Sequence, residues 1–494
     1  MQFMTQSVGQ IAILGAQTSP ETPKLRFTSN VIASMAAITD LLCLMLAVPI
    51  ALFGYERLIG LDYDPTIHNT AAIITGVNYF LIRLSRDAYS SPMGRGGDVQ
   101  QGGVLDYMIA SMLVVATVWQ LDLLSLFSRG LILIYVLAVL ALLFVSTYFL
   151  RWAISRLVRA GYIGQRVVIY GADEQVSERA LTLLDVERLP YLSIVGVADG
   201  RRTRVDVDGF GGVPFLGGLD AVVDLARQGL VDQVLIALPR ITQERLDEIL
   251  ADLAEVAIDI CLIPRESVEL TSRYEMKFIG SVPILALWQR PIRDWHGILK
   301  FVEDRGLALV GIIFLAPLLA ATAIAIKLTS PGPVLFVQRR FGFNNVEIEV
   351  LKFRSMYVDR GDVTGAARTT RNDDRVTPVG RIIRRLSIDE LPQLFNVLRG
   401  DMSIVGPRPH ATHMKVGDAY YFDAVKGYAA RHRVKPGITG LAQVRGLRGE
   451  IDTIERARKR VEYDRYYIDN WSLAFDFRII FETVFKVIWD KDVY

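Results

Sequence analysis

Two adjacent carboxylates, Asp389 and Glu390, lie in the apolar segment "SIDELPQL", and arginines flank this segment on both sides. An ionised aspartate can attack phosphorus, while a neighbouring glutamate that points elsewhere can handle a proton or a metal ion. Paired carboxylates without a histidine are also typical of magnesium-assisted phosphate chemistry. The pair therefore indicates a site that acts on phosphate groups.

The residues next to this pair allow two interpretations. Ser387 and Glu390 fit a capping box, in which Glu390 would only bond back to the start of a helix. Pro392, however, is best placed at the first position of a helix, which leaves Asp389 and Glu390 just before its positive end. In that second arrangement, arginines such as Arg384 favour ionised carboxylates at neutral pH.

The same part of the chain is rich in arginine, as in "QRRFGFNN", "RNDDRVTPVGRIIRRL" and "RHRVKPG". These guanidiniums are dispersed among glycines, prolines and strand-like segments. This pattern suits a phosphate site better than a helix face for nucleic acid, because each arginine can bind phosphate oxygens bidentately. The alternative is a basic face held against anionic lipid headgroups. We expect both uses, by different arginines, and no nucleic-acid partner.

The composition of the chain predicts the compartment in which these residues work. Of its 494 residues, 51% are hydrophobic, and its formal charge of +2 does not favour polyanion binding by the whole chain. Apolar stretches of nearly membrane-spanning length cover 31 to 55, 66 to 84, 104 to 124 and 130 to 150. Lysines and arginines flank both ends of this unit, so both ends are expected in the cytoplasm.

Polar residues in the N-terminal part give three smaller expectations. Asp40, inside the first apolar stretch, is either functional or paired with another helix of the bundle, and pairing is favoured. Cys43 and Cys261 are expected in the core, because two cysteines in apolar runs indicate neither a disulfide framework nor a zinc site. Residues 1 to 30 show no cleavable signal peptide and form an N-terminal cytoplasmic segment.

Residues 160 to 265 predict a Rossmann-like α/β domain, because short buried strands such as "RVVIYG" and "DQVLIAL" alternate with helical runs. A dinucleotide site would need glycines at the positions that Gly171, Asp173 and Val176 occupy. Asp173 would repel a pyrophosphate, and Val176 would crowd the helix. The sequence therefore favours a structural or regulatory domain, followed by a linker at 266 to 299.

A fifth apolar run, 305 to 328, is long enough to span a membrane, but two features argue against spanning. Cations flank both of its ends, so the positive-inside rule favours the cytoplasm for each. Pro317 near its middle bends the helix. We expect a re-entrant helical hairpin, and a plain kinked spanning helix is the alternative.

Three motifs identify a family resemblance over 295 to 494. The segments "KFRSM", "RVTPVGRIIRRLSIDELPQLFNVLRGDMSIVGPRP" and "KPGITGLAQV" resemble the bacterial sugar transferases, which are monotopic polyprenol-phosphate hexose-1-phosphate transferases (phosphoglycosyl transferases). Within the catalytic stretch, Ile388 replaces the usual leucine. The four-helix unit and the Rossmann-like domain resemble the long form of that family. The resemblance implies an α+β membrane protein in which residues 31 to 152 cross the bilayer and 300 to 494 form the catalytic domain.

The resemblance also implies an activity and its residues. A hexose 1-phosphate passes from a UDP-sugar to undecaprenyl phosphate, UMP is released, and a surface polysaccharide is begun at the cytoplasmic face of the inner membrane. Asp389 is the implied nucleophile and Mg²⁺ ligand, and Glu390 is its partner. The implied phosphate- and nucleotide-binding residues are Lys352, Arg354, Arg384, Arg408 and, with a less defined role, Lys435.

Finer features of the C-terminal region stay open. "QVRGLRGEIDT" (443 to 453) resembles the arm of undecaprenyl-phosphate glucose phosphotransferases, which favours UDP-glucose over UDP-galactose, although Ile451 departs from the usual threonine. Residues 460 to 488 predict an amphipathic helix on the bilayer, with core packing as the alternative. Homodimerisation is plausible. Two other classes remain, an NAD-dependent sugar-nucleotide enzyme and a non-enzymatic export scaffold.

Overall fold

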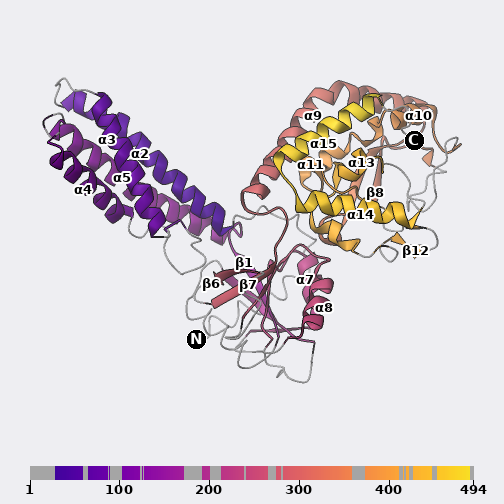
Figure 1. The fold of residues 1–494 in the computed structure, drawn as a ribbon. Coiled ribbons are helices and arrows are strands. Elements are labelled where there is room, and N and C mark those ends of the chain that lie inside the picture. The colour runs from indigo at the N-terminus through magenta and orange to yellow at the C-terminus, as the bar shows by residue number, and fades with distance from the viewer. Residues whose placement is uncertain are drawn as a thin grey trace, which may run out of the picture.

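The structure is a computed structural model with three parts: a helical unit, a middle domain built on a sheet and a C-terminal domain (Figure 1). It describes residues 28–58, 65–86, 88–89, 103–122, 125, 127–171, 192–200, 213–238, 241–264, 274–279, 282–358, 373–410, 415–416, 419–421, 425, 427–447 and 453–489. The predicted N-terminal segment therefore lies almost entirely outside the described residues.

Each of the four N-terminal apolar stretches is helical. The helices are α2 (Ser29–Leu58), α3 (Pro65–Ser85), α4 (Gly103–Gln120) and α5 (Arg129–Arg159). α2 packs on α5, and α3 packs on α4. Small side chains such as Ala47 and Ala110 lie in the shared core, where they let helix backbones approach closely. Cys43 is buried in the same core, as predicted.

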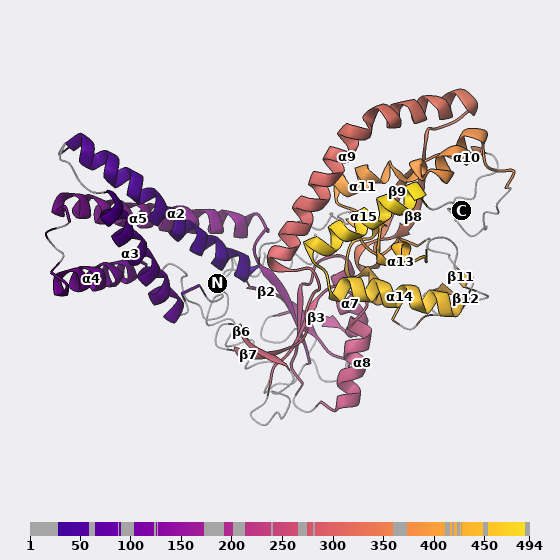
Figure 2. The same cartoon turned by 45° about the horizontal axis from the view of Figure 1, so that its top comes forward.

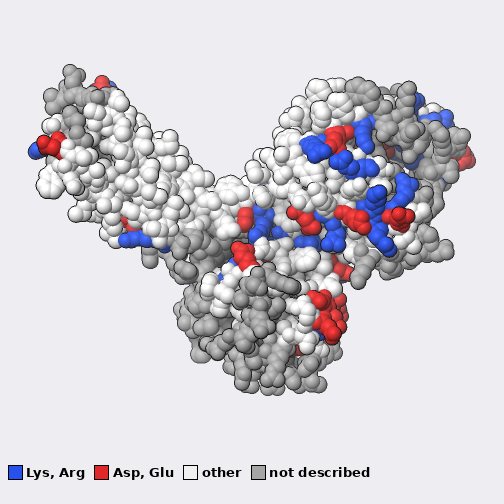
Figure 3. Space-filling model, viewed as in Figure 1, with Lys and Arg blue, Asp and Glu red and all other residues white. Residues whose placement is uncertain are grey.

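The outer surface of this helical unit is apolar along its length. Large side chains such as Met45, Phe53 and Phe149 are exposed on it, and Figure 3 shows charged residues only near its ends. Within the described chain, α2, α4, α5 and a later helix, α9 (Asp294–Thr329), are long and apolar enough to cross a membrane. Such a surface is stable in lipid rather than in water, so the chain is a membrane protein.

Inside the helical unit, charged side chains from three neighbouring helices meet. Tyr79 donates a hydrogen bond to Asp40 at 2.7 Å, and Arg83 lies 3.7 Å from the same carboxylate. Arg83 and Arg86 pair with Asp106 at 3.6 and 2.7 Å. We call Asp40, Arg83, Arg86 and Asp106 the helical-unit ion cluster. Asp40 thus faces neighbouring helices, in agreement with the favoured interpretation.

The middle domain is a seven-stranded sheet of order β3-β2-β1-β4-β5-β7-β6. Its first five strands pair in parallel, whereas β7 pairs antiparallel with both β5 and β6. The strands are β1 (Gln165–Tyr170), β2 (Leu192–Ala198), β3 (Phe215–Gly217), β4 (Gln233–Ile236), β5 (Asp259–Leu262), β6 (Glu275–Ile279) and β7 (Val282–Trp288). Two described helices, α7 (Leu219–Arg227) and α8 (Gln243–Leu253), accompany them. The mixed α/β prediction is confirmed.

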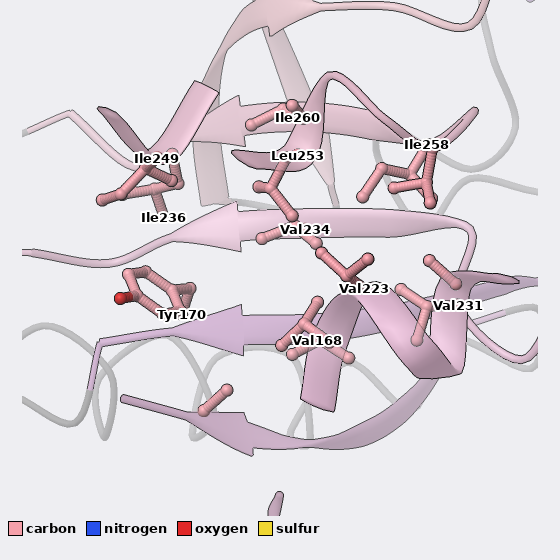
Figure 4. Packing of buried hydrophobic residues seen from close by; sticks show 14 of the residues in the cluster. Val168, Tyr170, Val223, Val231, Val234, Ile236, Ile249, Leu253, Ile258 and Ile260 are labelled. Atoms are coloured by element: carbon pink, nitrogen blue, oxygen red, sulfur yellow. The ribbon is translucent and has the colours of Figure 1, made fainter. Parts of the chain in front are cut away.

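The core of this domain forms between the sheet and its helices. Val168, Val234 and Ile260 of the strands pack against Val223 of α7 and Leu253 of α8 (Figure 4). These residues are buried. Parallel strands that are covered on both faces carry apolar side chains on each face. The domain positions the segment that leads into α9.

Two features of the middle domain go beyond the sequence prediction. The segment predicted as a linker, 266 to 299, contains β6 and β7, which extend the sheet past residue 265. Gly171 has φ +119°, and a Cβ there would lie 2.6 Å from the carbonyl oxygen of Ala237. This close approach of two strand ends explains the glycine without a nucleotide. Asp173 and Val176 lie outside the described residues.

The C-terminal domain begins with α9. Its further elements are β8 (Leu335–Phe341), η4 (Phe343–Asn345), β9 (Glu347–Phe353), α10 (Pro378–Arg385), η6 (Ile388–Glu390), α11 (Gln393–Arg399), β10 (Ser403–Val405), β11 (Lys415–Val416), β12 (Ala419–Tyr420), η7 (Ala429–Arg433), β13 (Gly437–Thr439), α13 (Leu441–Val444), α14 (Ile454–Asp469) and α15 (Leu473–Trp489). β8 and β9 form an antiparallel hairpin, and β10 pairs with β13 in parallel.

α9 is one continuous helix that bends along its length (Figure 2). It contains Pro317, which favours such a bend. Both halves pack on the C-terminal domain: Ala308 joins a core with Leu394, whereas Ile326 joins a core with Phe353. Residues 305 to 328 thus lie in one bent helix, and the expected hairpin of two antiparallel helices is not seen there.

The predicted helix at 460 to 488 is two helices, because α14 ends at Asp469 and α15 begins at Leu473. Trp471, between them, is buried and donates a hydrogen bond to Asp476 at 2.9 Å. Phe475 packs in the same core. For these two aromatic residues the structure supports core packing. Among the described side chains of α15, the exposed large apolar ones are Phe477, Phe481, Val484 and Phe485.

Candidate active site

A hairpin and a helix place the first cation of the site. Lys352 is near the end of β9, and α11 is fastened to the same strand by Asn396. The Asn396 side chain accepts from the backbone N–H of Leu351 at 2.9 Å and donates to the carbonyl oxygen of Glu349 at 2.6 Å. Because α11 follows directly after Asp389 and Glu390, this clamp brings the carboxylate pair close to Lys352.

The carboxylate pair lies in a short 3-10 turn between α10 and α11. Ser387, with φ 56°, reverses the chain after α10 and forms no side-chain cap on this turn. Pro392 is the N-cap of α11, one residue earlier in the helix than predicted. The carboxylate of Glu390 is not used for capping, because it bonds to two cations instead. The second interpretation of the sequence therefore describes the site better.

Glu390 is held by Lys352 and Arg408. Lys352 Nζ lies 3.1 Å from Oε1 of Glu390, and the two terminal nitrogens of Arg408 donate to its two oxygens at 2.5 and 3.2 Å. This bidentate pair fixes the orientation of the carboxylate. The structure thus brings Lys352, Glu390 and Arg408 together.

The two neighbouring carboxylates have opposite electrostatic environments. Burial raises the pKa of Asp389 to about 6, the Glu390 carboxylate adds to the rise, and Lys352, Arg384 and Arg408 oppose it. Burial also disfavours the ionised form of Glu390, but Arg408 and Lys352 outweigh this and hold its pKa well below the usual range. Glu390 is therefore a fixed anion, whereas Asp389 is a half-buried carboxylate that titrates close to neutral pH.

Arg384 acts on Asp389 from the last turn of α10. Arg354 and Lys435 are placed differently. Arg354 is buried and donates to the carbonyl oxygens of Pro331 and Ser330 at 2.9 and 2.8 Å, where it holds the end of α9. Lys435 lies near Asp304 and Asp401, whose charges partly offset the lowering of its pKa by burial. Neither contacts Glu390 in the structure.

The motifs did not single out two arginines that support Arg408. Arg340 on β8 donates to the carbonyl oxygen of Pro409, and Arg431 donates to that of Arg408 at 2.8 Å. The two guanidiniums hold the chain at Arg408 from two sides. Arg340 lies in an arginine-rich segment, but no local pattern distinguishes it from its neighbour Arg339.

The site has the ligands for a shared magnesium site and not for an all-protein one. Within the described ranges, no group of three or more histidine, cysteine, aspartate or glutamate side chains could hold a metal ion. Lys352 and Arg408 occupy the oxygens of Glu390, which leaves Asp389 as the ligand of the pair. One carboxylate with substrate phosphate oxygens and waters is a common Mg²⁺ arrangement, so the residues fit this ion.

Two known families match parts of the chain. Residues 295–490 match the family described as bacterial sugar transferase, and residues 85–264 match the family described as CoA-binding domain. The first match contains the whole carboxylate site. The second ends where the middle sheet turns antiparallel.

Characterised proteins resemble the chain over much of its length. It is 34% identical over 489 residues, 96% of the chain and 98% of the relative, to the UDP-glucose:undecaprenyl-phosphate glucose-1-phosphate transferase of Xanthomonas campestris pv. campestris. It is 38% identical to the undecaprenyl-phosphate glucose phosphotransferase of Komagataeibacter xylinus, over 72% of the chain and 65% of that protein. It is 42% identical to the UDP-glucose:undecaprenyl-phosphate glucose-1-phosphate transferase of Escherichia coli (strain K12), over 56% of the chain and 59% of that protein.

Proposed function

Because the chain belongs to the bacterial sugar transferase family, we propose that it transfers glucose 1-phosphate from UDP-glucose to undecaprenyl phosphate and releases UMP. This reaction would begin an exopolysaccharide, capsule or O-antigen repeat unit at the inner membrane. The second candidate donor is UDP-galactose. The glucose preference rests on the names of the relatives and on the 443 to 453 segment, of which 448 to 452 lie outside the described residues.

The observation that carries the proposal is the unequal state of the two carboxylates. Glu390 is held by Lys352 and Arg408, so it orients and does not attack. Asp389 is half-buried and lies next to the same cations, which favour its ionised form and attract phosphate groups. One residue of the pair is therefore suited to be a nucleophile and the other to position the cations.

In the first step, an Asp389 oxygen attacks the phosphorus that carries the sugar. The phosphoanhydride bond breaks, UMP leaves with the bonding electron pair, and a phosphosugar-aspartyl intermediate remains. In the second step, a phosphate oxygen of undecaprenyl phosphate attacks the same phosphorus. Asp389 then leaves as a carboxylate, and the product is the sugar diphospholipid.

The cations of the site stabilise the charge that builds up on the transferring phosphoryl group. The charges of Lys352, Arg384 and Arg408 all act on Asp389. Because Glu390 already holds Lys352 and Arg408, these cations need little reorganisation during the reaction. Mg²⁺, when held by Asp389 and the diphosphate, would neutralise charge on the leaving UMP.

This chemistry can be tested by UMP release from the full chain in nanodiscs with magnesium and undecaprenyl phosphate. UDP-glucose, UDP-galactose and UDP-N-acetylglucosamine are compared as donors. We expect UMP from UDP-glucose and a hexose-phosphate mass addition on the peptide containing Asp389. Asp389→Asn should lose both, whereas Glu347→Gln, an exposed carboxylate on β9, should lose neither. Turnover by folded Asp389→Asn, or no UMP from any donor, would refute the proposal.

We further propose that α9 does not span the membrane, so the active site faces the cytoplasm. Asn30, at the start of α2, donates to Asp294, at the start of α9, at 3.0 Å, so both helices begin at one level. The second half of α9 packs on Phe353 and Ile383 of the domain that also holds its first half. A helix anchored to one domain at both halves can insert its exposed face, which includes Ile313 and Phe314, into a single leaflet.

Cysteine labelling in intact spheroplasts tests this topology. Asn345→Cys, between β8 and β9, should resist a membrane-impermeant thiol reagent until the cells are opened. Asp122→Cys, in the loop after α4 that the positive-inside rule places outside, should react at once. The native Cys43 and Cys261 are buried and provide a low background. Reaction of Asn345→Cys in intact cells would mean that α9 spans.

A further inference from the structure

Arg460 of α14 is a buried cation with two donor nitrogens that lack a hydrogen-bond partner among the described residues. Its side chain is 1% exposed, and its Nε and Nη2 atoms have no hydrogen-bond partner in the described ranges. Buried guanidinium donors without hydrogen-bond partners are costly and are seldom retained in a protein without a reason. The neighbours of Arg460 indicate what that reason is.

Arg460 belongs to a group of guanidiniums behind Arg408. Asp464, one helical turn after Arg460 on α14, forms an ion pair at 2.8 Å with Arg431. Arg431 in turn donates to the carbonyl oxygen of Arg408 at 2.8 Å, and Arg340 donates to the next carbonyl oxygen, that of Pro409. We call Arg340, Arg431 and Arg460 the buried arginine cluster.

Among the described residues around Arg408, cations outnumber carboxylates. The cations are Lys352, Arg408 and the buried arginine cluster, and the carboxylates that act on them are Asp389, Glu390 and Asp464. Burial, together with Arg431 and Arg408, lowers the pKa of Arg460 to about 10. Burial, together with Arg408 and Arg460, lowers the pKa of Arg340 to about 10 as well. Among the described residues of this region, positive charge therefore exceeds negative charge.

Two buried histidines of the same region report the same field. Burial and the charge of Arg431 lower the pKa of His432 to about 3. Burial and the charges of Arg431 and Arg460 also hold the pKa of His410 well below its usual range. A neutral His410 can accept from Arg431, which lies 2.6 Å from its Nδ1 atom. These histidines therefore add no positive charge, and the excess comes from the arginines.

The position of α14 indicates which anion would supply the missing charge. In Figures 1 and 2, α14 lies on the side of the C-terminal domain away from α9. The exposed apolar face of α9 is the lipid side, so α14 faces the side from which a soluble substrate arrives. A soluble nucleotide diphosphate fits this position better than the phosphate of a lipid acceptor.

We propose that Arg460 is a positioning residue whose charge, together with Arg340 and Arg431, strengthens binding of the diphosphate group of the nucleotide donor at Arg408. The inference rests on the proposed function and adds to it a residue that does not touch the substrate. The anion makes the excess buried charge favourable, and in its absence the same charge destabilises the fold.

The test measures UDP binding to the full chain in nanodiscs by calorimetry for wild type, Arg460→Met and Arg460→Lys. Arg460→Met keeps an unbranched apolar stem but removes the guanidinium and its charge, and UDP affinity should fall roughly tenfold, as expected for one charge acting through several ångströms of protein. Arg460→Lys should recover most of the loss. Arg458→Met, an exposed arginine on the same helix, should bind UDP like wild type.

Two further readouts separate charge from structure. Without nucleotide, Arg460→Met should melt at the same or a higher temperature than wild type, because a buried cation with unsatisfied donors is gone. The KM for UDP-glucose should rise, whereas binding of a short-chain polyprenyl phosphate should stay unchanged. Selective weakening of the polyprenyl phosphate would assign the cluster to the acceptor and overturn the inference.

Unchanged UDP affinity in folded Arg460→Met also overturns it, as does equal weakening by Arg460→Met and Arg460→Lys, which would point to shape. If wild type releases no UMP from any donor, the proposed function fails. If wild type is active and Arg460→Met binds UDP normally, only the role of Arg460 fails.

Discussion

The helical-unit ion cluster and the carboxylate site both bury several charged side chains, but only one of them is balanced. In the helical unit, Asp40 and Asp106 face Arg83 and Arg86. At the carboxylate site, the described cations outnumber the described carboxylates that face them. A balanced cluster is complete within the protein and contributes to its architecture. An unbalanced one is complete only when an anion binds, which is the property that a site for phosphates requires.

The largest effect is expected where one change removes a cation from the unbalanced site. Arg408→Met should lower UMP release about 10²–10³-fold, because it removes a fixed donor next to the reacting phosphate. It should also destabilise the protein by about 3 kcal/mol, since the buried Glu390 keeps only Lys352 as a partner. Turnover and the melting temperature are measured on one preparation.

A double variant separates these two effects. Arg408→Met with Glu390→Gln should recover the melting temperature, because no uncompensated charge remains, but it should not recover turnover. Arg399→Met, which removes only a half-exposed pair with Asp401, is the control for both measurements. Recovery of turnover in the double variant would mean that Arg408 serves only to neutralise Glu390.

The balanced cluster should behave in the opposite way. Arg83→Met leaves Asp40 with its hydrogen bonds from Tyr79 and Tyr89, and it leaves Asp106 with Arg86. The loss of a buried counter-ion should cost about 3 kcal/mol. UMP release per folded molecule should not change, because the cluster is remote from the carboxylate site. The midpoint of thermal unfolding in nanodiscs and the turnover of the folded fraction test the two statements. Loss of turnover without loss of stability would contradict them.

The pH dependence of the reaction sharpens the comparison at Asp389. The attacking form is the carboxylate, and its pKa is raised to about 6, so the rate should fall about tenfold per pH unit below 6 and level off above it. Glu390, with a lowered pKa, stays ionised over this range. Arg384 opposes the rise in the pKa of Asp389, so Arg384→Met should move the acidic fall in rate to higher pH. Arg385→Met, at an exposed neighbouring position, should not move it. A limb near pH 4 in wild type would contradict the burial of Asp389.

The elements and the central site residues could be predicted because their signals are local. Apolar runs of helical length and short strands between turns gave α2 to α5 and the parallel sheet. The motifs identified Lys352, Glu390 and Arg408 as site residues because these motifs are specific, and the structure brings the three side chains together. β6 and β7 were missed because an edge hairpin depends on pairing with β5, which no local pattern encodes.

Arginines show the limit of the sequence most clearly. Arg354 and Arg408 lie in equally specific motifs, but one holds helix carbonyls and the other a carboxylate, and only the packed structure separates them. Arg460 lies in the charged segment "IERARKRVEYDR" and looks like a solvated residue. Its spacing from Ala457 and Asp464 puts it on the buried face of α14, and this helical phase was the one signal that could have revealed it.

The smallest predicted effect tests whether burial, and not ion pairing alone, distinguishes the two clusters. Arg86 pairs with Asp106 at 2.7 Å, closer than the 3.6 Å of Arg83, but its side chain is 49% exposed whereas that of Arg83 is 1% exposed. Water screens the exposed partner, so Arg86→Met should cost less than about 1 kcal/mol in the melting experiment. If it destabilises as much as Arg83→Met, the distance between the charges rather than their burial sets the stability of the cluster. The buried charge at Arg460 would then be weaker support for its proposed role.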